Sequence, residues 1–147
     1  MGLQQKVMEQ MKTAMKAKDT VALESLRAIK SALLLAQTSG DGDLSEEDEV
    51  KLVQKLVKQR KDSATIFNEQ GRNDLAEPEL AQVAIIEQFL PEQLTEEEIE
   101  KVVVQTIDAT GASGMKDMGK VMGMVSKELA GQADGKTIST IVKNKLS

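Results

Sequence analysis

Three lysines in the C-terminal part of the chain have the spacing of a phosphate-binding surface. Lys116, Lys120 and Lys127 are separated by four and seven residues, and such side chains share one face of an α-helix. Lysines that neutralise phosphates bind nucleic acid by charge and shape, with little discrimination between sequences. The alternative is an ordinary solvated face, since helices commonly expose lysine. We include Lys136 and Lys143, on the last predicted helix, among the candidate phosphate contacts.

Two glycines lie within the same predicted helix. Gly119 and Gly123 are four residues apart and therefore fall on one face. A glycine inside a helix costs roughly 0.5–1 kcal/mol relative to alanine, so some interaction should offset it. The spacing favours close packing against a neighbouring helix. The other interpretation is that bare backbone approaches RNA here, and both hold if each glycine serves one purpose.

Two short motifs resemble phosphate-binding loops without completing one. Residues 114–120 match G-x-x-x-x-G-K, but Val121 follows where a P-loop needs Ser or Thr, and a predicted helix precedes it in place of a strand. This favours a loop that enters a helix. Residues 131–135 favour a corner between two helices over an anion site, because Asp134 is placed to cap the next helix with its own carboxylate.

The chain has no Cys and no His. Disulfides, thiol chemistry, Cys-based zinc sites and catalytic triads that need His are therefore excluded. We expect no catalytic residue, cofactor or metal. Aromatic residues make up 1% of the chain, which argues against a sheet protein and against recognition by base stacking.

The longest apolar run is far shorter than the roughly 18 residues of a membrane span, and no basic segment precedes an apolar one as in a signal peptide. These features predict a cytoplasmic protein without a membrane partner.

Charge is distributed unevenly along the chain. Residues 1–38 contain six bases and three acids, and residues 112–147 contain the same numbers, so each end carries a net charge of +3. Residues 39–94 contain six bases and thirteen acids, and residues 95–111 one base and five acids. Either end can therefore meet an anionic partner although the whole chain has a net charge of −5.

Helical spacing of apolar residues predicts four N-terminal helices. The first covers about 2–17, and the second is capped by Asp19 and ends near Thr38, before a Gly/Asp-rich loop at 39–43. Ser45, with Asp48 three residues later, begins a long helix that Gly71 ends. The fourth covers about 73–89, with either a kink or its start at Pro78.

The clearest boundary in the sequence is Leu90-Pro91, since proline disfavours helix in the residue before it. Beyond it, Thr95 and Glu98 form a capping box for a helix to about Ala109. Two more helices are predicted over about 116–129 and 135–146. The methionines at 115, 118, 122 and 124 are expected to fill gaps in the core. The predicted fold is all-α, with an N-terminal arm of about four helices over 1–91 and a three-helix bundle over 95–147.

The sequence resembles the GatB/YqeY family, and it resembles stand-alone YqeY-like proteins over nearly its full length. The resemblance rests on residues 58–63, 89–99, 111–113, 117–123, 131–135 and 141–143. It implies that the C-terminal part is similar to the tail domain of the B subunit of the tRNA-dependent amidotransferase, a helical appendage that engages tRNA. A carbon–nitrogen ligase activity with glutamine as amido-N-donor is implied by the family, but nothing here resembles the domains that carry the chemistry.

These features predict a helical binding protein associated with tRNA or with tRNA aminoacylation. The expected partners are tRNA and a tRNA-aminoacylation or amidotransferase protein. Two alternatives remain open: a protein–protein adaptor that docks through the Met/Leu face of the N-terminal arm, and an amidotransferase accessory active only with a catalytic subunit.

Overall fold

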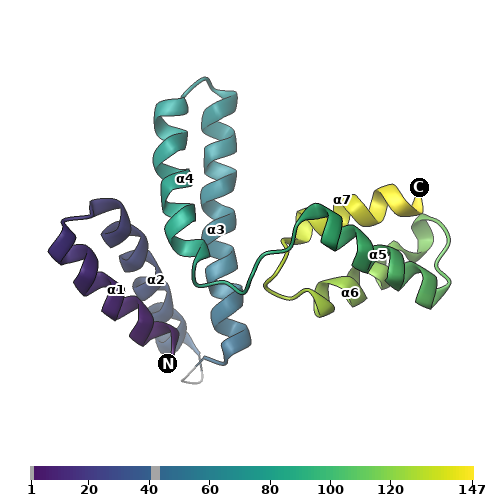
Figure 1. Cartoon of the computed structure of the whole chain (residues 1–147), viewed down its shortest axis with the longest axis horizontal. Coiled ribbons are helices and arrows are strands. Elements are labelled where there is room, and N and C mark those ends of the chain that lie inside the picture. The colour runs from purple at the N-terminus through teal and green to yellow at the C-terminus, as the bar shows by residue number, and fades with distance from the viewer. Residues whose placement is uncertain (1, 41–43) are drawn as a thin grey trace. The chain divides into compact units, whose positions relative to one another are not determined.

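The computed structural model describes residues 2–40 and 44–147, and among these residues it contains helices and no strand (Figure 1). The all-α prediction is confirmed. The chain divides into two compact units between Leu90 and Pro91. The loop predicted at 39–43 lies partly outside the described residues.

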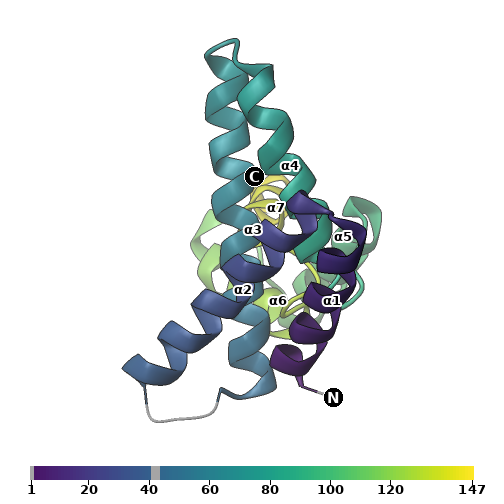
Figure 2. The ribbon, with the colours of Figure 1, turned by 90° about the vertical axis from the view of Figure 1, so that its left-hand side faces the viewer.

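The first unit consists of two helical hairpins. Helices α1 (Leu3–Ala17) and α2 (Thr20–Ser39) pack against each other, as do α3 (Glu46–Glu69) and α4 (Asn73–Glu87), and α2 also contacts both α3 and α4 (Figures 1 and 2). The predicted caps form, since the Asp19 carboxylate accepts a hydrogen bond from the Ala22 amide and the Ser45 hydroxyl from that of Asp48, each at 3.1 Å. Each cap satisfies an amide that has no partner within its helix.

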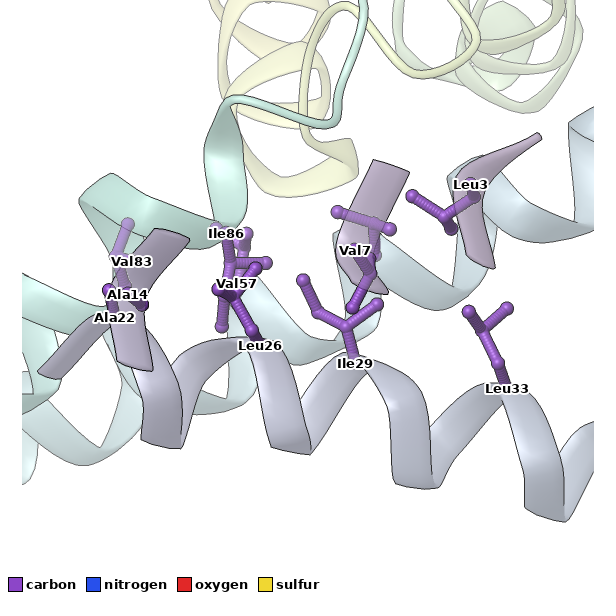
Figure 3. Packing of buried hydrophobic residues seen from close by; sticks show 11 residues of the cluster. Leu3, Val7, Ala14, Ala22, Leu26, Ile29, Leu33, Val57, Val83 and Ile86 are labelled. Carbon is purple, nitrogen blue, oxygen red and sulfur yellow. The ribbon is translucent and has the colours of Figure 1, made fainter. Parts of the chain in front are cut away.

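Helix α2 supplies the middle of the core of this unit. Leu26 and Ile29 are 1% and 0% exposed. Figure 3 shows Leu26 beside Val57 of α3 and Ile86 of α4, while Val7 of α1 lies beside Ile29. Burial of each such aliphatic side chain contributes roughly 1.5–3 kcal/mol to folding.

Helix α4 begins five residues before its proline. It starts at Asn73, two residues after Gly71, which has a left-handed φ of +73°, and it continues through Pro78. A start at Pro78 was therefore wrong. Ala76, 1% exposed, anchors the first turn in the interior. The carbonyl that Pro78 leaves without an amide partner belongs to Asp74, an exposed residue, so that water can bond to it.

A polar bridge joins three helices of the first unit. Arg60 Nε on α3 donates to Gln82 Oε1 on α4 at 2.8 Å, and Gln82 Nε2 donates to Glu24 Oε2 on α2 at 3.4 Å. Arg60, which interrupts the apolar stripe of α3, is half-buried at this crossing. Its guanidinium also donates to the Leu56 carbonyl at 3.1 Å.

The second unit is a three-helix bundle in which α5 (Glu96–Thr110), α6 (Met118–Glu128) and α7 (Gly135–Leu146) all contact one another. The capping box at Thr95 and Glu98 is confirmed, as is the Asp134 cap of α7. The bundle core contains Ile99, Val103, Val121, Val125, Leu129, Ile138, Val142 and Leu146.

The helix predicted from Lys116 has a different start. A 3₁₀ turn, η1 (Met115–Asp117), comes first, and α6 begins at Met118. Gly114 has a φ of +92°, and the Asp117 carboxylate accepts a hydrogen bond from the Ser113 amide at 2.9 Å. The tight turn follows from this bond, which periodicity of apolar residues does not reveal.

The segment before α5 is bonded to the bundle. The Leu94 amide donates to the Gln132 carbonyl at 2.9 Å, and Gln93 Nε2 donates to the Gly131 carbonyl at 2.7 Å. The start of α5 is therefore tied to the corner between α6 and α7.

The polar bridge predicts a difference between two neighbouring bases of α3. Arg60→Ala should lower the free energy of unfolding by about 1 kcal/mol, because it leaves the Oε1 atom of half-buried Gln82 without its donor. The matched control is Lys58→Ala, which removes an exposed 3.7 Å ion pair to Asp62 and should cost less than about 0.5 kcal/mol. Urea denaturation of both variants measures this, and equal effects would contradict a structural role for the bridge.

Candidate nucleic-acid interface

The outward face of α6 is set by the two valines on its other side. Val121 and Val125 are both 0% exposed in the bundle core. With 3.6 residues per turn, Gly119 and Gly123 fall on the opposite side of the helix, and both are exposed. The glycines therefore face away from α5 and α7.

Close helix packing at these glycines was a wrong prediction. A Cβ atom placed on Gly119 or on Gly123 would meet no atom within 4 Å beyond its own stretch of helix. Among the described residues, no neighbouring helix uses the space that a side chain would fill. The reason is that the bundle packs against the valine side of α6, which the spacing of the glycines alone did not reveal.

Lys120 and Lys127 lie beside Gly123 on α6. Lys120, Gly123 and Lys127 are spaced three and four residues apart on α6, and Lys116 lies in the 3₁₀ turn that leads into it. All three lysines are exposed, and within residues 2–40 and 44–147 none of them forms an ion pair with a carboxylate. Their charge is thus free for an external anion. We call Lys116, Gly119, Lys120, Gly123 and Lys127 the α6 face.

Lys136 and Lys143 form a separate group on α7. They are exposed and lie on the side of α7 opposite buried Ile138 and Val142. The nearby Lys145 instead forms an ion pair with Glu100 of α5 at 2.6 Å, and this pair links α7 to α5. The predicted basic residues thus divide between the outward faces of two helices.

Two methionines flank the α6 face. Met115 and Met124 are 45% and 46% exposed, so the expectation that they fill the core is wrong for these two. Met118 and Met122 do pack against the core. Exposed methionine is a polarisable side chain that adapts to a partner surface. The sequence carried no signal for the exposure of Met124, because its spacing of three residues from Val121 is that of a buried stripe.

The start of α7 is already occupied by a carboxylate. Asp134 accepts hydrogen bonds from the Thr137 amide at 2.7 Å and from its hydroxyl at 3.1 Å, so the corner at 131–135 offers no open anion cradle. The start of α6 has no side-chain cap, because the Asp117 carboxylate instead accepts a hydrogen bond from the Ser113 amide, which precedes the 3₁₀ turn. The α6 face presents exposed lysine side chains and exposed helix backbone to solvent.

Across the part of the chain that the structure describes, no group of three or more Asp or Glu side chains is arranged to hold a metal ion. None of the described helices combines the length and hydrophobicity that crossing a membrane requires.

The fold and the α6 face define a small all-helical protein with an exposed basic surface and a glycine-bearing helix. The sequence matches the family described as Yqey-like protein over residues 4–146. The chain belongs to this family, and the resemblance stated from its motifs is confirmed.

Two kinds of named relative share the similarity. "Altered inheritance of mitochondria protein 41, mitochondrial" of Pyrenophora tritici-repentis is 30% identical over 125 residues, which cover 84% of this chain and 68% of that protein. The protein of the same name in Clavispora lusitaniae is 32% identical over 123 residues, 82% of this chain and 72% of the relative. The E subunit of the glutamyl-tRNA(Gln) amidotransferase of Thermococcus gammatolerans is 33% identical over 104 residues, 68% of this chain but only 17% of that protein.

The relatives correct the predicted location. Several of them are named as mitochondrial proteins, which contradicts the cytoplasmic prediction. That prediction was wrong because short apolar runs and the lack of a signal-peptide pattern are compatible with several compartments and select none.

The open surroundings of Gly123 predict an unusual gain in stability. Gly123→Ala should raise the free energy of unfolding by about 0.5–1 kcal/mol, because the new methyl group meets nothing and alanine favours helix. Gly119→Ala should gain less, since Gly119 lies in the first turn of α6.

The matched control is Gly111→Ala at the end of α5, where φ is +66° and the change should cost about 1–2 kcal/mol. Urea denaturation followed by circular dichroism compares the three variants. A loss of stability in Gly123→Ala would mean that the glycine is needed inside the bundle.

Proposed function

We propose that this protein is a helical binding protein associated with tRNA or with tRNA aminoacylation, and that the α6 face of its C-terminal bundle contacts the RNA. The observation that carries the proposal is the exposure of Gly119 and Gly123 inside a helix, with open space where their side chains would be.

Two helical glycines lower stability without any compensating contact in the bundle. A ligand that must approach the helix backbone closely accounts for them, because a methyl group at either position would hold it away. The sugar-phosphate backbone of RNA fits this requirement. Lys116, Lys120 and Lys127 surround the glycines and supply the positive charge that phosphates need.

The comparisons favour tRNA among RNA ligands. The family likeness extends to proteins named as the E subunit of glutamyl-tRNA(Gln) amidotransferase. Because this chain spans 17% of the Thermococcus gammatolerans protein, the similarity supports a role in partnership with an amidotransferase or a related tRNA-aminoacylation protein. Carbon–nitrogen ligase chemistry with glutamine as amido-N-donor would then require the catalytic partner.

Binding of bulk tRNA to the full chain tests the proposal. Binding should occur at low salt and weaken steeply toward physiological salt, because it depends on displaced counterions. Lys116→Glu/Lys120→Glu/Lys127→Glu should weaken it more than tenfold, while circular dichroism stays helical. The matched control reverses three exposed lysines of α3: Lys51, Lys55 and Lys58.

The glycines provide a second readout of the same contact. Gly119→Ala/Gly123→Ala should weaken tRNA binding by about tenfold, or about 1.4 kcal/mol, although it should make the protein more stable. Absence of binding by the unmodified chain at low salt would refute stand-alone tRNA binding. Unchanged binding by the alanine variant would remove the glycines from the contact.

A protein–protein adaptor is the second candidate, because the first unit exposes large apolar side chains. Met8 and Met15 on α1 are 43% and 58% exposed, and Leu35 on α2 is 70% exposed. A partner held by these side chains would bind with little dependence on salt, because burial of apolar surface does not depend on counterions. Salt dependence of binding therefore separates the two candidates.

A further inference from the structure

The methionines of the described residues fall into a packed group and an exposed group. Met11 packs against the core of the first unit, and Met118 and Met122 pack against the core of the bundle. The exposed group has exposed fractions of 43–58% and consists of Met8, Met15, Met115 and Met124. An exposed thioether is open to oxidants in solution, whereas a packed one is shielded by its neighbours.

Met124 is the exposed methionine that lies beside two lysines of the α6 face. Lys120 precedes it by four residues and Lys127 follows it by three. Side chains at these spacings are neighbours on a helix, with about 5–6 Å between their Cβ atoms. Met115 is equally exposed, but it lies in the 3₁₀ turn and has no lysine three or four residues away in the sequence. A chemical change at the Met124 sulfur therefore takes place beside two candidate phosphate contacts.

The side chain of Met124 does not contribute to the packing of the bundle. The half-buried side chains that pack on the bundle core include those of Met118 and Met122, but among the described residues that group does not include Met124. An oxygen atom added to Met124 should therefore leave the fold intact. The same change at Met122 would place a polar group against apolar side chains, which costs folding free energy.

We propose that Met124 is a site of reversible oxidation by peroxides, and that its oxidation weakens the binding of RNA at the α6 face. This inference rests on the proposed function, to which it adds control by an oxidant. In the reaction a sulfur lone pair attacks one peroxide oxygen, so that an S–O bond forms and the O–O bond breaks. The sulfur loses two electrons, and the second oxygen takes the proton of the transferred oxygen and leaves as water.

The sulfoxide changes what Met124 offers to the neighbouring lysines. Its oxygen accepts hydrogen bonds, and the ammonium groups of Lys120 and Lys127 are donors at neighbouring positions of the helix. The acid nearby, Glu128, follows Met124 by four residues, and as a carboxylate it has no proton to donate. A lysine that donates to the sulfoxide is held back from a phosphate, and the oxidised side chain no longer presents an apolar surface to a ribose.

Peroxide treatment of the full chain tests this site. Hydrogen peroxide should oxidise Met124, which mass spectrometry of peptides detects, and it should weaken the binding of bulk tRNA at low salt by about three- to tenfold, the effect of one polar interaction. Methionine sulfoxide reductase should restore the affinity. Met124→Leu keeps an apolar side chain that peroxide does not oxidise, so this variant should bind tRNA normally and keep its affinity after treatment. The matched control, Met115→Leu, should lose affinity as the unmodified chain does.

A permanent polar substitution gives a second test that needs no oxidant. Met124→Gln places a neutral hydrogen-bond acceptor beside the same lysines and should weaken tRNA binding by a similar factor. Met115→Gln, at the equally exposed position in the 3₁₀ turn, should leave the affinity unchanged. Circular dichroism and urea denaturation verify that both variants and the oxidised chain remain folded.

Four outcomes would overturn the inference. If Met124 stays reduced while the other exposed methionines are oxidised, it is not the modified site. If Met124 is oxidised and tRNA affinity does not change, the sulfur has no control over binding, and the proposed function stands. If Met115→Leu protects the affinity and Met124→Leu does not, the sensitive sulfur lies elsewhere. If the oxidised chain loses its helical signal, the loss of binding reflects unfolding. A chain that binds no tRNA before oxidation refutes the proposed function, and this inference with it.

Discussion

Burial of Val121 and Val125 determines what α6 presents to solvent. Both valines lie fully inside the bundle, against α5 and α7. Because a helix is rigid and has 3.6 residues per turn, burying one side exposes the other. Gly119, Gly123 and the lysines around them are therefore held outward by apolar packing that none of them takes part in. The exposure of the candidate site is therefore a consequence of how the bundle core is packed.

Helices within each unit differ in how their charged residues are used. Acidic residues begin α3 and α5, where carboxylates near a helix N-terminus are favourable, and several bases of α3 are paired with them or with other acids. Among the described residues, bases without an ion pair include all those of α1, α2 and α6, and Lys136 and Lys143 of α7. A protein with a net charge of −5 can thus present cationic surfaces. Ion pairs neutralise several bases of α3, whereas the exposed lysines of α6 have no such partner among the described residues.

Local chemistry made most helix boundaries predictable. Asp19, Ser45, Thr95 and Asp134 all accept the expected amide hydrogen bonds, because a cap depends on residues three positions apart and little else. Predictions that depended on contacts between helices were less successful. Three of them failed: the packing of Gly119 and Gly123 against a helix, the burial of Met115 and Met124, and the alternative that a helix starts at Pro78. Each depended on what lies across the core.

The sequence by itself determined the helical class, the caps, the family and the set of candidate lysines, since spacing, side-chain type and motif are properties of the chain. Tertiary structure decided which face of each helix is buried, and with it that Gly119 and Gly123 are open. It also decided that Lys145 is paired with Glu100 while Lys136 and Lys143 remain free, within the described residues, for an external anion. These outcomes depend on contacts between distant segments, and the positions of residues along a single helix do not specify them.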